Sequence, residues 1–142
     1  MIVLDTTVLA HALGAEHPLR DPGRLLLAAH AEGRVEATTT VEVIGEFAHI
    51  RTRRQGRPDA VRLARRYMAA FSLLITTPDD LDRGLELFER CSALGAFDAV
   101  LAAVALDRGA EALVSSDRAV ASVPVLLVID PATPAILRLI GD

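Results

Sequence analysis

The 142-residue chain has 51% apolar residues, which is enough for one domain with a hydrophobic core. Its net charge of −4 means that the chain as a whole is not a polycation that would bind nucleic acid by charge alone. All fifteen basic residues are arginine, which excludes chemistry that needs a lysine, such as P-loop nucleotide hydrolysis or Schiff-base catalysis. The single cysteine, Cys91, excludes an internal disulfide and a cysteine-based zinc cluster, and it favours a reducing compartment.

Membrane and export signals are not expected in this sequence. The longest apolar runs, 99–106 and 123–129, are shorter than the roughly 18 residues of a membrane helix. The first residues carry no positively charged segment, and Asp5 interrupts their apolar run, so a signal peptide is not expected. We therefore predict a single domain over residues 1–142 that works in the cytoplasm without contact with a membrane.

The chain begins with the run Ile2-Val3-Leu4, which is apolar without alternation. Such a run predicts a strand that is buried on both faces of a parallel sheet. Residues 6–14 then predict a short helix that Gly14 stops, and residues 17–23 predict a loop.

Predicted helices and strands alternate along the rest of the chain. Helices are expected at 24–33, 40–56, 57–71, 78–91, 97–109 and 131–142, and strands at 34–39, 72–77, 112–116 and 125–130. This alternation predicts an α/β fold with a mainly parallel sheet. In such sheets, functional sites form outside the carboxyl ends of the strands, which is where Asp5 stands.

Four of the nineteen acids adjoin apolar sequence instead of lying on a polar helix face. They are Asp5 after the first strand, Glu46 inside an apolar part of a helix, Asp98 at the start of an apolar helix, and Asp117 after the strand at 112–116. Two carboxylates about 4 Å apart repel by ~4 kcal/mol at an effective dielectric of 20, so several in one pocket must protonate or bind a cation. Oxygen ligands of this kind suit Mg²⁺ or Mn²⁺.

Each of these acids also has a purely structural explanation. Asp98 could cap its helix, and Asp117 could be a turn or cap residue. Glu46 could point to solvent, and Glu42, one turn earlier on the same face, competes with it for a role in the site. Asp5 could cap the helix that follows it.

Four segments, taken in order, resemble the PIN-domain ribonucleases and, within them, the VapC toxins of bacterial toxin–antitoxin pairs. The segments are IVLDTTVL at 2–9, VIGEFAHIRTRR at 43–54, GAFDAVLAAVAL at 95–106 and ALVSSDRAV at 112–120. DTTVL alone is a weak signal, but the ordered set covers nearly the whole chain. The resemblance implies a three-layer sandwich with a central, mainly parallel sheet of four or five strands. It also implies an endoribonuclease that uses Mg²⁺ or Mn²⁺ to hydrolyse RNA phosphodiester bonds.

The resemblance assigns roles to residues of this chain. The catalytic acids are Asp5, Glu46, Asp98 and Asp117; of these, Asp5, Asp98 and Asp117 hold the metal, and Glu46 binds it directly or through water. Glu42 remains the alternative to Glu46. Hydroxyl groups near the metal are expected from Thr6, Thr7 and Ser115. The implied partners are a VapB-like antitoxin whose C-terminal segment lies across the active site and a second toxin chain, in a homodimer or a toxin–antitoxin hetero-oligomer.

Arginines are concentrated at 51–66, where seven of them and one acid give a net charge of +6. Such a patch predicts contacts with RNA phosphates, for which the candidates are Arg51, Arg53, Arg54 and Arg57. A solvated helix face or a surface for the antitoxin is the alternative. Aromatic residues are only 4% of the chain, so we expect recognition of RNA shape and backbone and no row of stacked bases.

Two other functions match part of the sequence. A phosphatase of the haloacid-dehalogenase type also begins with a strand that ends in Asp, but it needs a second Asp where this chain has Thr7, and it needs a lysine. A PIN fold that binds RNA or protein without cleaving it is the second alternative. A nuclease assay with and without a chelator separates this alternative from the enzyme.

Overall fold

Four short parallel strands form the central sheet of residues 1–141, the part of the chain that the computed structural model describes. The strands are β1 (Ile2–Leu4), β2 (Ala37–Thr38), β3 (Ala112–Val114) and β4 (Val128–Ile129), and they lie in the order β2-β1-β3-β4. The predicted α/β class with a parallel sheet of four or five strands is therefore confirmed, with four strands.

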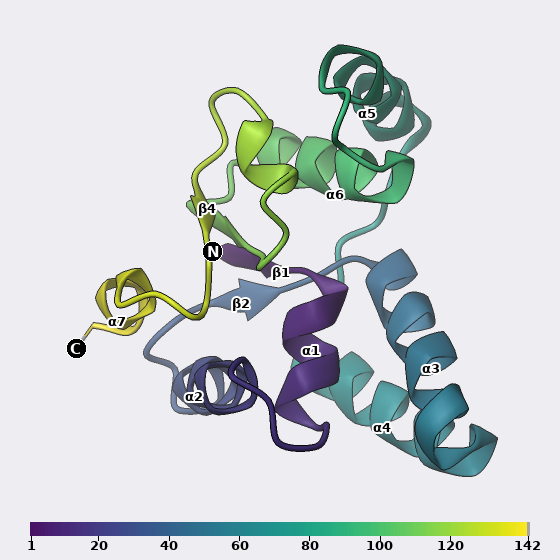
Figure 1. The fold of residues 1–142 in the computed structure, drawn as a ribbon, viewed down its shortest axis with the longest axis vertical. Helices are drawn as coiled ribbons and strands as arrows, with labels where there is room; N and C mark the ends of the chain where they lie inside the picture. The colour runs from purple at the N-terminus through teal and green to yellow at the C-terminus, as the bar shows by residue number, and fades with distance from the viewer. Residues whose placement is uncertain (142) are drawn as a thin grey trace.

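Helices cover both faces of this sheet. They are α1 (Thr6–Ala12), α2 (Arg20–Ala31), α3 (Val41–Gln55), α4 (Arg57–Ala70), α5 (Pro78–Arg90), α6 (Ala96–Asp107) and α7 (Ala135–Ile140), with a short 3-10 helix at Val120–Ser122. Figure 1 shows α5 and α6 on one side of the sheet and α1 and α2 on the other, with the α3–α4 hairpin next to α1. None of the helices within residues 1–141 is long and apolar enough to cross a lipid bilayer.

The central position of β1 follows from its sequence. Ile2, Val3 and Leu4 are almost completely buried, as expected for a strand covered on both faces. Leu4 pairs with Val114 at the end of β3, and the register brings the residues after the two strands to the same edge of the sheet. The side chain of Asp5 therefore begins at the edge where sites form in parallel sheets.

The predicted loop at 17–23 was partly wrong, because α2 already begins at Arg20. Pro22 falls in the first turn of this helix, where a missing backbone N–H costs no hydrogen bond. Gly23 lets α2 approach α1 closely, since a Cβ atom there would lie 3.1 Å from both the carbonyl oxygen of Val8 and the Cβ of Ala12. Proline and glycine thus serve helix packing here and do not mark a loop.

The strands predicted at 34–39, 72–77, 112–116 and 125–130 are all shorter or absent in the structure, where 34–39 is reduced to β2 and 112–116 to β3. The segment 72–77 contributes only an isolated bridge between Leu74 and Thr40, so the strand predicted there was wrong. The strand predicted at 125–130 shortens to β4, because Val125 has a φ of 67° and is not extended. The final helix, predicted at 131–142, is α7; its last predicted residue, 142, lies outside the described residues.

Close packing of α5 on α6 fixes the helix that carries Asp98. A Cβ atom added to Gly84 would lie 2.7 Å from the Cα of Val100, so only glycine allows this approach. Asp98 stands two residues before that contact, in the first turn of α6. The start of α6 is therefore held in place by the body of α5.

Candidate active site

Asp5 is buried at the junction of β1 and α1, where it caps the helix and faces the sheet edge. Its Oδ1 accepts hydrogen bonds from the backbone N–H groups of Thr7, at 2.9 Å, and Val8, at 3.3 Å. The Thr7 hydroxyl donates to the same oxygen at 2.6 Å, and the Ser115 hydroxyl donates to Oδ2. The capping role that the sequence offered as an alternative is thus real, and it holds the carboxylate at the carboxyl end of β1.

The predicted hydroxyl residues all contact the acids. Thr6 donates to Oε2 of Glu46 at 2.8 Å, and this hydrogen bond joins the start of α1 to the middle of α3. Thr7 and Ser115 hold Asp5 from two sides. Sequence reasoning missed Ser116, whose hydroxyl lies 3.5 Å from that of Thr7; the pair Ser115-Ser116 directly after a strand was the available signal.

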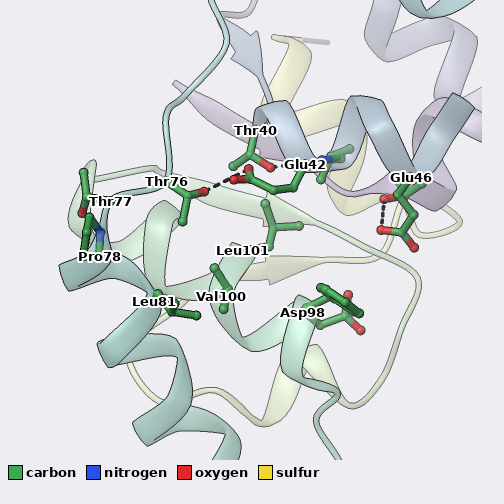
Figure 2. Close-up of a pocket in the computed structure, with 13 residues that line it drawn as sticks. Thr40, Glu42, Glu46, Thr76, Thr77, Pro78, Leu81, Asp98, Val100 and Leu101 are labelled. Carbon is green, nitrogen blue, oxygen red and sulfur yellow. Dashed lines mark hydrogen bonds between the residues drawn. The ribbon is translucent and has the colours of Figure 1, made fainter.

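Glu46 and Glu42 lie on the same side of α3, but their carboxylates have different partners. Glu46 bonds to Thr6, next to Asp5. Glu42 accepts a hydrogen bond from the Thr76 hydroxyl at 3.0 Å, and Figure 2 shows its carboxylate turned toward Thr76, away from Glu46 and Asp98. This geometry favours Glu46 over Glu42 as the partner of the other acids.

Asp117 follows β3 in a tight turn. Its backbone N–H donates to the Ser115 hydroxyl at 3.1 Å, and its Oδ1 accepts from the N–H of Ala119 at 2.9 Å. The turn role that the sequence offered as an alternative is therefore present as well. It uses one carboxylate oxygen, and Asp117 is exposed, so the other oxygen is available to a ligand.

Asp98 does not cap α6, because the N-cap residue is Gly95 and Asp98 stands three positions further on. Burial is the largest influence that raises the pKa of Asp98, which reaches about 6. The next causes are the negative charges of Asp117, Asp5 and Glu46, in that order. The structure therefore brings all four acids into electrostatic contact.

No cationic side chain neutralises this group of acids. Of the ion pairs formed within residues 1–141, none includes Asp5, Glu46, Asp98 or Asp117. Their carboxylates are not drawn together as tightly as metal ligands, since no three His, Cys, Asp or Glu side chains in the described chain are close enough to hold an ion. The donor set, four carboxylates with neighbouring hydroxyls, has the oxygen chemistry that fits Mg²⁺ or Mn²⁺.

Two of the four acids, Glu46 and Asp98, line a cleft of about 620 Å³ between α3 and the starts of α5 and α6. Much of the remaining lining is apolar, although Glu42 and Thr76 also belong to it. Figure 2 shows Leu81 and Val100 on the apolar side, between Asp98 and the Thr77–Pro78 turn. The cleft can therefore hold a ligand that is charged at one end and apolar at the other.

The predicted RNA-binding arginines differ in their surroundings. Arg51 is only 16% exposed; it donates to Asp59 at 2.6 Å and to the carbonyl oxygen of Leu13 at 2.9 Å. It therefore joins α3, α4 and the end of α1. Arg53, Arg54 and Arg57 are exposed around the turn between α3 and α4.

Comparison with known protein families matches residues 2–126 to the PIN domain. The chain is 51% identical to Ribonuclease VapC7 of Mycobacterium tuberculosis (strain ATCC 25618 / H37Rv), in an alignment that covers 100% of this chain and 99% of that protein.

Two solved structures have the same fold. VapC20 of Mycobacterium tuberculosis, described as a toxin that cleaves the sarcin-ricin loop, has a TM-score of 0.68 at 22% identity over 80% of this chain and 87% of its own. A chain of a toxin–antitoxin complex from Klebsiella pneumoniae has a TM-score of 0.69 at 17% identity over 92% of this chain and 98% of its own.

Proposed function

The chain belongs to the PIN-domain family, and on this premise we propose that it is a VapC-type endoribonuclease, the toxin of a toxin–antitoxin pair, which hydrolyses RNA phosphodiester bonds with a divalent cation. The 51% identity to a ribonuclease over the full length supports the activity. The observation that carries the proposal is the set of four acids at one sheet edge, where burial and then the negative charges of Asp117, Asp5 and Glu46 raise the pKa of Asp98.

The same four acids would hold the cation. Asp5, Asp98 and Asp117 offer carboxylate oxygens, and Glu46 offers another directly or through water. When bound, Mg²⁺ or Mn²⁺ would lower the pKa of a water molecule and would supply positive charge for the phosphoryl oxygens. Binding a cation would also remove the repulsion among the carboxylates, which explains why acids without a cationic partner are tolerated here.

The residues around the acids orient them for this task. Oδ1 of Asp5 is fixed by the N-terminal amides of α1, and Oδ2 is fixed by Ser115. Thr6 holds Glu46 at a distance set by the contact between α1 and α3. Hydrogen bonds of this kind fix the direction of ligand oxygens and commonly change metal affinity or activity by about 10- to 100-fold when removed.

An acidic cleft repels RNA, so the attraction must come from another surface. Arg53 stands seven residues after Glu46 on α3, which places it on the same helix face about 10 Å along the axis. Arg54 and Arg57 extend this positive surface around the turn into α4. We assign RNA phosphates to these three arginines and leave out Arg51, whose guanidinium Asp59 and Leu13 already occupy.

The direct test is cleavage of RNA by the purified protein with Mg²⁺ or Mn²⁺, with and without a chelator. We expect EDTA to abolish cleavage and Asp5→Asn to reduce it by more than about 100-fold. Asn keeps an oxygen for the amides of Thr7 and Val8, so the helix cap and the fold should survive. Asp79→Asn, at an exposed acid in the first turn of α5, is the matched control and should cleave normally.

Full cleavage in EDTA, or by Asp5→Asn, would refute the metal-dependent mechanism. If the wild-type protein binds RNA but cleaves none with either cation, the binding module without catalysis becomes the better description. Mapping the 5′ ends of RNAs that are newly cut after expression in a host identifies the substrate.

The arginine surface has its own test. The double variant Arg53→Glu, Arg54→Glu should weaken RNA binding and reduce its dependence on salt, because fewer phosphates are neutralised. Arg138→Glu on α7 is an exposed control on the other side of the molecule from α3 (Figure 1). Binding that is unchanged in the double variant would assign this surface to another partner.

We propose a VapB-like antitoxin as the protein partner and a dimer or toxin–antitoxin hetero-oligomer as the assembly, acting in the cytoplasm. The structural match to a chain of a toxin–antitoxin complex supports the fold that such a partner recognises. Co-expression of the chain with the product of a small neighbouring reading frame, followed by co-purification and mass measurement, tests both partner and assembly.

A further inference from the structure

Three of the five aromatic residues lie in the core, and Phe97 is the most exposed of the others. Phe47, Tyr67 and Phe71 are at most 5% exposed and pack on one another between α3 and α4. Phe88 on α5 is 46% exposed, and Phe97 in the first turn of α6 is 86% exposed. A ring this open packs little against the protein and leaves most of its apolar surface free to contact a ligand.

Phe97 stands where such a ligand would meet the acids. It precedes Asp98 in the chain, and both residues line the 620 Å³ cleft. Next to it the cleft wall is aliphatic, with Leu81, Val100 and Leu101. Glu46, Asp98 and the apolar wall line one cleft, so a ligand in it can contact both Asp98 and Phe97.

A nucleotide, like this cleft, combines a charged part with an apolar part. Its phosphate is drawn to a cation held by the acids, and its base has an apolar face that prefers an aromatic surface over water. We propose that Phe97 stacks on an unpaired base next to the scissile phosphate, and thereby fixes which phosphate of the strand reaches the acids. This inference rests on the proposed ribonuclease function and adds a subsite for one base to it.

The low aromatic content predicted that the protein has no row of stacked bases, and the structure leaves room for a single one. Because Phe47, Tyr67 and Phe71 are used in the core, the cleft can hold one stacked base and no row of them. Stacking is tolerant of base identity, since every base has a π-face. Phe97 would therefore select an unstacked, single-stranded position while arginines read the backbone.

The first experiment measures kcat/KM on a single-stranded RNA oligonucleotide and on versions with one abasic nucleotide at successive positions. Loss of a stacked base should lower kcat/KM by about 5- to 150-fold at one position next to the cleavage site. Phe97→Leu should lose a similar factor on the intact RNA and should no longer respond to the abasic nucleotide. Phe97→Trp should keep both properties, because indole stacks at least as well as phenyl.

Phe88→Leu is the matched control, since it makes the same substitution at an exposed phenylalanine outside the cleft lining. It should cleave like the wild type and keep the response to the abasic position. Equal losses in Phe88→Leu and Phe97→Leu would overturn the inference. Unchanged cleavage by Phe97→Leu, with the abasic response intact, would overturn it while leaving the ribonuclease function standing.

A binding measurement separates the inference from the nuclease activity. The chain contains no tryptophan, so Phe97→Trp introduces a single fluorophore at the cleft. In an Asp5→Asn background, which prevents cleavage, intact single-stranded RNA should quench this fluorescence, and the oligonucleotide with the abasic nucleotide should quench it much less. Phe88→Trp in the same background is the control and should not be quenched by either RNA.

Equal quenching of Phe97→Trp by the two RNAs would overturn the inference. So would a Phe97→Leu variant that loses binding to a protein partner and still cleaves RNA normally, because Phe97 would then be a protein contact. If wild-type protein cleaves no RNA with either cation, the ribonuclease proposal fails, and the fluorescence alone decides whether Phe97 stacks on a base.

Discussion

The first turns of α5 and α6 each carry an aspartate three residues after the N-cap, and the two aspartates ionise in opposite senses. Asp80 in α5 is 1% exposed, and Arg108 holds the pKa of its carboxyl well below the usual range. Asp98 in α6 is half-buried, and burial and other acids raise its pKa to about 6. The helical position is the same, so the difference comes from the surroundings: burial and nearby acids act on Asp98, whereas Arg108 acts on Asp80.

Asp80 is satisfied completely by groups of the chain. Arg108 donates to its two oxygens at 2.9 and 2.8 Å, and the N–H of Thr77 donates at 2.8 Å in a capping box. Asp98 has the negative charges of three acids around it, and it forms no ion pair with an arginine of residues 1–141. A buried acid that carries its own counter-ion is structural, whereas one surrounded by like charge needs a ligand from outside.

The largest effect on stability is expected from removing the charge of Asp80. Asp80→Asn leaves Arg108 without its partner and should lower the free energy of unfolding by about 2–4 kcal/mol. Since the pKa of Asp80 is lowered in the folded state, its contribution is complete above the ordinary pKa of about 4 and disappears as the pH falls below it. Urea unfolding followed by circular dichroism at pH 7.5 and pH 3 measures both quantities.

Asp107→Asn is the control for this effect, because Asp107 pairs with Arg83, whose side chain is 56% exposed. An exposed pair of this kind contributes at most about 1 kcal/mol. If Asp80→Asn costs no more than Asp107→Asn, then Asp80 is not the structural acid of this comparison.

Asp80 was not singled out from the sequence, although Thr77-Pro78-Asp79-Asp80 has the spacing of a capping box. Its partner, Arg108, lies 28 residues away in the sequence, and the local pattern does not predict such a contact. The contact of Arg51 with Leu13, which spans 38 residues, was not visible in the sequence for the same reason. Sequence patterns report the local period of a helix or strand, and they do not report which distant charges meet.

The four candidate acids could be picked out from the sequence because each one adjoins or interrupts an apolar pattern. Asp5 ends a buried strand, and the parallel sheet then dictates which edge it faces. The order of helices and strands followed from the same periodicity, apart from the ends of α2 and β4 and the segment 72–77. The choice between Glu42 and Glu46 needed coordinates, because both residues lie on one face of α3 and only their partners differ.

The opposite stability effect is expected at Asp98. In metal-free buffer at pH 7.5, Asp98→Asn removes one charge from a group that repels itself, and the free energy of unfolding should rise on the order of 1–2 kcal/mol. The same variant should lose RNA cleavage, since Asp98 is one of the proposed metal ligands. Unfolding curves and a cleavage assay on the same preparation test whether stability and activity move in opposite directions.

Glu42→Gln provides the control, because Glu42 is an exposed acid of the same cleft that bonds to Thr76 and does not perturb Asp98. It should change stability by less than about 0.5 kcal/mol. A loss of stability in Asp98→Asn as large as in Asp80→Asn would show that Asp98 is held by a favourable contact and is a structural acid like its counterpart in α5.

The smallest effect is the pH dependence of the stability that Asp98→Asn gains. The sign of this pH dependence distinguishes Asp98 from Asp80. With a folded-state pKa of about 6 and an ordinary value of 3.8, wild-type Asp98 keeps a proton in the folded state that the unfolded chain releases. Wild-type stability should therefore fall as the pH rises from about 4 to 6, which is the reverse of the trend that Asp80 produces. In metal-free buffer the difference in free energy of unfolding between wild type and Asp98→Asn should be a few tenths of a kcal/mol at pH 4.5 and should reach its full size above pH 7. A gap that stays constant between pH 4.5 and 7.5 would mean that charge repulsion is not what distinguishes the start of α6 from the start of α5.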